Sequence, residues 1–289
     1  MPDMVASVVV LLLAGGPARL DADGVEMLLP SAPGVDFHLG ARDPNATGGF
    51  EIEQHTRATP VREGPLAFWS VAAHPLDYAS GGSGVTVRLH IHPGKDPQRF
   101  TWRTQRGYLS APGDLQNQEF TAYVRVHGVS DPSRAAISLK VRGGAHTARD
   151  PDLASCVMMT FQAATMGATT RFGKELAHPL YDYVRLTPKL PAALVENRWF
   201  GLKVVSTARP QQPSPVVNRL YVDDEPWDAA GRPRNHWRLL SEYVDVEGAS
   251  TGRYTKLVDW GAWQTTLRTD GIRTLDFAIL SAREVIPPP

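Results

Sequence analysis

The chain has 289 residues, 30 basic and 30 acidic side chains, and a hydrophobic fraction of 42%. This balance of charge argues against non-specific nucleic-acid binding, which needs a surplus of positive charge. One cysteine, Cys156, excludes an internal disulfide. The 25 glycines and 24 prolines favour many turns between short strands over long helices.

The N-terminal segment, residues 1–20, is either a signal-like segment or a first strand. Its apolar run (MVASVVVLLLAG) has the length of a signal-peptide core, but Asp3 sits where positive charge is expected. A signal-like segment would favour a secreted or periplasmic location over a cytoplasmic one. The run is too short to span a bilayer, so no membrane insertion is expected.

Strand signals follow one another through the rest of the chain, separated by turn clusters such as DPNATGG and ASGGSG. The predicted strands are 26–29, 50–54, 66–72, 85–91, 100–103, 120–127, 137–142, 157–161, 183–186, 199–206, 217–222, 237–245, 254–258, 264–268 and 275–280. So many short strands predict an all-β fold, a jelly-roll β-sandwich. We expect the sandwich at 113–289, with 21–112 as an N-terminal β region of extra strands packed on it.

Basic and aromatic side chains share one face of three predicted strands, because side chains alternate along a strand. The polar face of each strand carries no acidic residue. It holds Tyr123, Arg125 and His127 in the first strand, Lys140 and Arg142 in the second, and Arg88, His90 and His92 in the third. Segment 199–206 adds Trp199 and Lys203 on one face. These faces predict an anionic ligand; the alternative is scattered surface charge with salt-bridge partners on neighbouring strands.

We expect four of these cations to converge on one concave face and to bind the ligand there: Arg125, Lys140, Arg142 and Lys203. Arginine suits carboxylate or sulfate through its bidentate geometry, and aromatic faces suit sugar rings.

Segment 171–185 gathers Lys174, Glu175, His178, Tyr181 and Tyr183 within a short stretch, with Pro179 preventing a continuous helix. Such a stretch can bring histidine and tyrosine together for acid–base work. The alternative is a loop held by hydrogen bonds from these side chains.

Metal ligation has two candidate places. The spacing of His90 and His92 is similar to the first half of the cupin metal motif, but the expected glutamate and later histidine are missing, so no metal is expected there. The acidic loop after 217–222 can bind a structural calcium, or its carboxylates pair with Arg232, Arg234 and Arg238. Its members are Asp223, Asp224, Glu225 and Asp228. No cofactor is required by these patterns.

Residues 113–286 resemble the concanavalin A-like lectin/glucanase jelly-roll superfamily, and within it the alginate-lyase-like polysaccharide lyases. The resemblance rests on the order of the Arg125 strand, the Lys140/Arg142 strand and the late lysine strand WFGLKVV. The family's Gln-x-His strand and Tyr-Phe-Lys motif are not present as such. The resemblance implies that a cation neutralises a uronate carboxylate and that histidine or tyrosine takes the C5 proton.

The first functional hypothesis is therefore β-elimination on an acidic, uronate-containing polysaccharide. The catalytic candidates are His178 with Tyr181, or His127 with Tyr123, together with Arg142. The binding candidates are Arg125, Lys140, Lys174, Trp199, Lys203, Arg88, His90 and His92. A non-catalytic carbohydrate-binding protein is the alternative. A glycoside hydrolase is third, because Asp245 and Glu247 share a face as in retaining glucanases.

Overall fold

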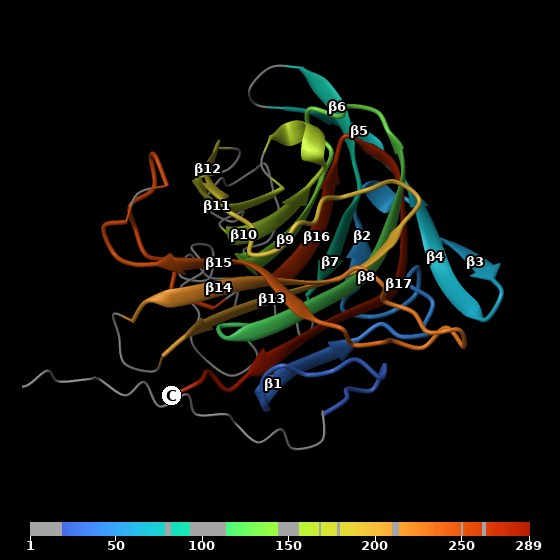
Figure 1. Cartoon of the computed structure of the whole chain (residues 1–289), viewed down its shortest axis with the longest axis horizontal. Helices are drawn as coiled ribbons and strands as arrows, with labels where there is room; N and C mark the ends of the chain where they lie inside the picture. Colours follow the sequence, from blue (N-terminus) through green and yellow to red (C-terminus); the bar gives the residue numbers. More distant parts are fainter. Residues whose placement is uncertain are drawn as a thin grey trace, which may run out of the picture.

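The computed structural model describes residues 19–78, 82–92, 114–143, 156–167, 169–177, 180–209, 214–249, 251–261 and 264–289. These residues form two packed antiparallel sheets and a two-stranded ribbon of β5 and β6, which lies at the opposite end of the molecule from β1 (Figure 1). The prediction of an all-β sandwich is confirmed.

The larger sheet has eight strands in the order β15-β14-β13-β8-β17-β4-β3, and β1 pairs with β17 beside this path. Its strands are β1 (Ser31–His38), β3 (Thr59–Glu63), β4 (Leu66–Ala72), β8 (Gln118–Val129), β13 (Trp199–Ala208), β14 (Val216–Asp223), β15 (Arg238–Asp245) and β17 (Ile272–Val285).

The smaller sheet has seven strands in the order β12-β11-β10-β9-β16-β7-β2. Its strands are β2 (Phe50–Ile52), β7 (Arg88–Ile91), β9 (Ala136–Gly143), β10 (Cys156–Gln162), β11 (Thr170–Ala177), β12 (Leu180–Leu186) and β16 (Gln264–Asp270). The ribbon consists of β5 (His74–Asp77) and β6 (Ser83–Thr86), and two short 3-10 turns cover Glu53–His55 and Ala164–Met166.

The core lies between the sheets and follows the alternation of the strands. Phe120 and Val124 of β8 point inward and join Leu139 of β9 and Leu267 of β16 in one cluster, all with no exposed surface. The opposite side of each sheet, which we call its outer face, carries the polar residues of the same strands. The sandwich therefore presents two outer faces, one on each sheet.

Strands on both sides of the predicted boundary near residue 112 are hydrogen-bonded neighbours in both sheets: β4 pairs with β17 and β7 pairs with β16.

Four strands of the described residues were not predicted, namely β1, β3, β5 and β11. Residues 254–258 form no strand, and residues 26–29 contribute only an isolated bridge from Glu26 to Leu20. The strand predicted at 100–103 lies outside the described residues.

Candidate functional site

The residues singled out in the sequence lie in three separate places. Arg125, His127, Tyr123, Lys203 and Trp199 belong to β8 and β13 of the eight-stranded sheet. The outer face of the seven-stranded sheet holds Lys140, Tyr181, Arg88 and His90, and His92 follows the end of β7. Arg142 and Lys174 point into the interior between the sheets, and His178 lies outside the described residues.

On the outer face of the eight-stranded sheet, Arg125 is already fully paired. Its two terminal nitrogens each donate to Glu63 at 2.8 Å, and its Nε donates to Asp276 at 3.0 Å. His127 contacts the same Asp276 through Nε2 at 2.6 Å and Asn197 through Nδ1 at 2.6 Å. These pairs match the alternative interpretation of cations with partners on neighbouring strands.

Tyr123 and Lys203 are covered by the segment that precedes β1. Lys203 Nζ donates to Glu119 at 2.8 Å and to the backbone carbonyl of Glu26. Tyr123 has no exposed surface and packs against Trp227, with ring centroids 4.8 Å apart. Burial raises the pKa of Tyr123 well above its usual value. The Tyr123 Oη is also buried with no hydrogen-bond partner among the described residues, so the pairing of Tyr123 with His127 is poorly suited to proton transfer.

Arg142 departs from the alternation of β9. Its φ is +55°, and its guanidinium donates to Ser206 Oγ of β13 and to the carbonyl of Trp260, both at 2.9 Å. The positive φ turns the side chain inward, next to an irregularity in the pairing of β16 with β9. Burial lowers the pKa of Arg142 to about 10.

The predicted convergence of Arg125, Lys140, Arg142 and Lys203 on one face is therefore wrong. Two of these cations lie on the outer face of one sheet, Lys140 lies on the outer face of the other, and Arg142 lies between the sheets. Lys174 is also interior, because its Nζ pairs with Asp245 at 2.7 Å and neither side chain is exposed. Asp245 is one of the two carboxylates on which the glycoside hydrolase hypothesis rested, and this ion pair engages it.

A cluster of hydrogen-bonded charged residues lies on the outer face of the seven-stranded sheet, and we call it the Tyr181 cluster. Its members are Lys140, Glu175, Tyr181, Arg268 and Asp270. Tyr181 Oη accepts from Lys140 Nζ at 3.3 Å and from Arg268 at 3.0 Å. Lys140 also donates to Glu175 at 2.8 Å, and Arg268 donates to Asp270 at 2.7 Å. One phenol oxygen is thus held between two cations.

The charges of the Tyr181 cluster are stabilised by one another. Burial lowers the pKa of Lys140, but the surrounding Cys156, Glu175 and Tyr181 outweigh it and raise the pKa above its usual value. Lys140 therefore stays protonated. Burial raises the pKa of Tyr181, while Lys140 and Arg268 act in the opposite direction without cancelling it. Tyr181 is consequently an uncharged phenol at neutral pH.

Beside the Tyr181 cluster, β7 brings in a second polar group. His90 Nδ1 lies 2.9 Å from Thr266 Oγ1 and 3.2 Å from Gln264 Nε2. Arg88 donates to Glu53 at 2.7 Å. His90 and Thr266 are register partners, and Thr266 is also the partner of Lys140, so the two groups adjoin.

Sequence reasoning missed Arg268, Asp270 and Gln264, and it noted Glu175 beside Lys174 without giving it a role. The first three belong to QTTLRTD, a strand whose alternate positions place them all on one face, so its periodicity carried the signal. Glu175 lies on β11, a strand that was not predicted because its polar residues hide the alternation.

The carboxylates of the acidic loop, for which calcium binding or salt bridges were the two alternatives, are engaged by arginines and backbone groups. Asp224 pairs with Arg238 at 2.5 Å, and Asp228 pairs with Arg232 at 2.8 Å. The remaining carboxylates are also engaged: Glu225 pairs with Arg234, and Asp223 accepts from two backbone N–H groups. This matches the salt-bridge alternative.

Another group of potential ligands in the described residues is formed by Asp21, Asp23 and His38, whose ligand atoms lie within 4.8 Å of one another. A hydrogen bond to Asp23, opposed by burial and aided by Asp21 and Asp36, raises the pKa of His38 to about 9. Together with Asp36, these side chains form an ion-pair network around His38.

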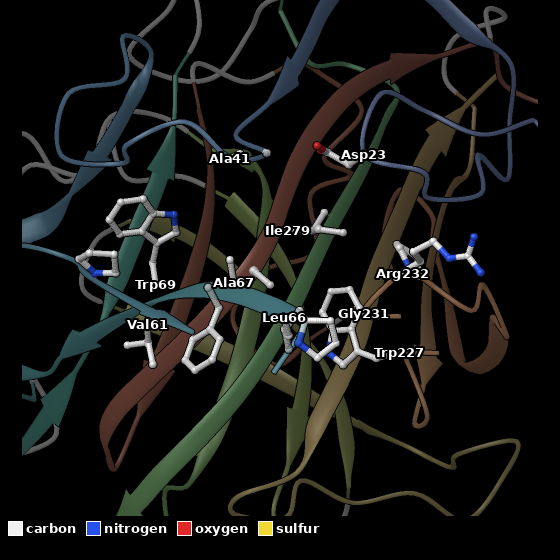
Figure 2. Close-up of a pocket in the computed structure, with 16 residues that line it drawn as sticks. Asp23, Ala41, Val61, Leu66, Ala67, Trp69, Trp227, Gly231, Arg232 and Ile279 are labelled. Atoms are coloured by element: carbon white, nitrogen blue, oxygen red, sulfur yellow. The ribbon is translucent and has the colours of Figure 1, made fainter. Parts of the chain in front are cut away.

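A hollow of about 380 Å³ lies away from the Tyr181 cluster, over the eight-stranded sheet. Trp69 and Trp227 stand on two sides of it, with Leu66 and Ile279 between them (Figure 2). Its lining is mostly apolar, and Asp23 and Arg232 contribute the charged groups.

No family model matches the chain, and no curated protein matches its sequence. Solved structures with a similar arrangement include an endo-β-1,4-glucuronan lyase from the fungus Trichoderma reesei, with a TM-score of 0.46 and 12% identity, covering 86% of this chain and 95% of that one. An alginate lyase from Aplysia kurodai has a TM-score of 0.45 and 6% identity, covering 83% and 91%. A legume lectin-like domain from Entamoeba histolytica has a TM-score of 0.44 and 6% identity, covering 87% and 97%.

The chain is an antiparallel two-sheet β-sandwich, as predicted from its sequence. Its structural neighbours include both polysaccharide lyases and lectins. At these identities the likeness concerns the fold, and fold alone does not assign an activity. Among the described residues, no helix is long and apolar enough to cross a membrane.

Proposed function

We propose that this protein acts on a uronate-containing polysaccharide by β-elimination, on the outer face of the seven-stranded sheet. The observation that carries the proposal is the position of Tyr181 Oη between Lys140 Nζ and Arg268. A uronate carboxylate that enters this cluster meets two cations, and a phenol oxygen capable of proton transfer lies beside them.

The chemistry follows from the weak acidity of the proton at C5, next to the carboxylate. Neutralising the carboxylate with Lys140 and Arg268 stabilises the enolate-like intermediate that forms when this proton leaves. The C4–O bond then breaks, a double bond forms between C4 and C5, and the departing oxygen takes up a proton. In its phenolate form Tyr181 takes the proton from C5, and the resulting phenol returns it to the departing oxygen. Arg88 and His90 hold the neighbouring part of the polysaccharide.

The pH profile separates the two candidate bases. Burial raises the pKa of Tyr181, so a reaction that needs its phenolate should continue to accelerate above pH 8. A reaction that depends on neutral His178 should instead level off near neutral pH, where an imidazole has lost its proton.

The direct test uses a panel of uronate-containing and neutral polysaccharides, followed by absorbance near 235 nm and by reducing ends. A Tyr181→Phe variant should lose at least about a hundredfold in rate, which is the usual contribution of a positioned acid or base. Tyr221→Phe, a half-buried tyrosine on the other sheet, is the matched control. No unsaturated product from any acidic polymer would end the lyase proposal, and full activity in Tyr181→Phe would remove Tyr181 from it.

One observation favours a second function, carbohydrate binding without catalysis. Lys140, Arg88 and Arg268 are all at least nine-tenths buried, and each already contacts a carboxylate. A uronate must then compete with Glu175, Glu53 or Asp270 for its cation. Calorimetric binding of a polysaccharide without new reducing ends or absorbance would support this function.

A further inference from the structure

A single row of residues crosses six strands on the outer face of the seven-stranded sheet and contains four arginines. The cross-strand partners run, in order, Arg88, Arg268, Ser138, Thr160, Arg171 and Arg185. Neighbouring strands lie about 4.8 Å apart, so the row extends roughly 24 Å from β7 to β12. We call it the arginine row.

The two halves of the arginine row differ in their partners. Arg88 and Arg268 pair with Glu53 and Asp270, each at 2.7 Å. Arg171 and Arg185 have no carboxylate partner among the described residues. They stand directly opposite each other on β11 and β12, a placement that is destabilising for like charges.

The surroundings of Arg171 position it without neutralising it. Its guanidinium lies 3.9 Å from the ring centroid of Tyr183, and its Nε–H is buried with no hydrogen-bond acceptor. Tyr183 can lie flat over β11 because its register partner there is Gly173, where a Cβ atom would come within 2.7 Å of the ring. Contact with a ring holds the guanidinium in place and leaves its charge available.

This half of the row is open to a ligand and continuous with the Tyr181 cluster. Tyr183 is 40% exposed and Arg185 is exposed. The rings of Tyr181 and Tyr183 are parallel, with centroids 5.9 Å apart. A polymer bound at Tyr181 would therefore have its next charged groups beside Arg171 and Arg185.

From these contacts we propose that Arg171 and Arg185 form an anion-binding subsite for a carboxylated glycan, next to the Tyr181 cluster. One carboxylate between two opposed guanidinium groups relieves their repulsion and accepts charge-assisted hydrogen bonds from both. The subsite rests on the proposed function only in that the same polymer occupies the same face. Its occupation requires no bond to break.

The experiment measures binding of uronate oligosaccharides by titration calorimetry to the unmutated protein and to Arg171→Ser, Arg185→Ser and the double variant. We expect each single variant to weaken binding about tenfold, the value of one lost charge-assisted contact, and to flatten the dependence of affinity on salt. Arg234→Ser is the matched control, because it removes the same charge from an exposed arginine that pairs with Glu225. It should leave the affinity unchanged.

Stability gives a second readout that a purely structural role would not produce. Removing Arg185, the exposed member of the repelling pair, should leave the free energy of unfolding of the unliganded protein unchanged or raise it. A clear loss of stability in Arg185→Ser, or unchanged affinity in the double variant, would overturn the proposal.

The ligand class is tested with sulfated dextran, neutral dextran and a DNA duplex of matched length. Stronger binding of the carboxylated oligosaccharide than of all three supports the subsite as stated. Equal or stronger binding of sulfated dextran or DNA would overturn the assignment to carboxylated glycans. Tight binding that depends on the two arginines, without an unsaturated product, would retain the subsite and end the lyase proposal. Formation of the unsaturated product, with the same affinity in the double variant as in the unmutated protein, would retain the lyase proposal and end the subsite.

Discussion

Replacing Glu119 by glutamine should destabilise the protein strongly. Glu119 is 3% exposed and accepts from Lys203 and Arg283, each at 2.8 Å, and from the backbone N–H of Leu28 at 3.1 Å. The amide keeps the shape but removes the charge, which leaves two buried cations without an anion. Removing one partner of a buried ion pair costs about 3–5 kcal/mol, a large part of the roughly 5–15 kcal/mol that stabilises a typical domain.

The measurement is urea unfolding at equilibrium, followed by circular dichroism. Glu242→Gln is the control, because its Arg219 contact of 2.6 Å joins side chains that are 27% and 29% exposed. A pair of that exposure contributes less than about 1 kcal/mol. The reasoning about this buried network is refuted if Glu119→Gln lowers the free energy of unfolding by no more than Glu242→Gln does. The slope of that free energy against urea concentration must be the same in both variants for the comparison to hold.

Two further predictions concern His38 and Gly173. Because the pKa of His38 rises from 6.5 to about 9, its stabilising contribution should be complete below pH 6.5 and lost as pH rises through about 9. Unfolding at pH 6 and pH 9.5 measures this loss, and a His38→Ala variant with the same pH dependence would contradict it. Gly173→Ala should push Tyr183 off β11 and cost about 1–3 kcal/mol, whereas Gly48→Ala, with open space around it, should stay within about 0.5 kcal/mol. Equal unfolding midpoints for the two glycine variants would count against the packing argument.

The sequence predicted the strand faces well wherever the alternation was regular. In β8, the inward position of Val124 and the outward positions of Arg125 and His127 follow directly from period two. Arg142 breaks that rule, because a positive φ beside an irregular pairing turns its side chain inward. Such a deviation depends on the register of neighbouring strands, which a single sequence does not contain.

The candidate site was only partly predictable for the same reason. Lys140 and Tyr181 were identified, but their neighbour Arg268 comes from a strand more than 80 residues away in sequence. Lys174 looked like a surface cation because its partner Asp245 belongs to the opposite sheet. Periodicity assigns a residue to a face, whereas sheet order decides which faces meet.

The position of β17 has a consequence for synthesis of the protein. β17 pairs with β8, β4 and β1, all of which are translated earlier. Until β17 leaves the ribosome, those three strands lack the neighbour that joins them into one sheet, and their edges are open to other chains. The larger sheet should therefore complete only after translation has passed residue 285, and the emerging chain should depend on chaperones during that interval.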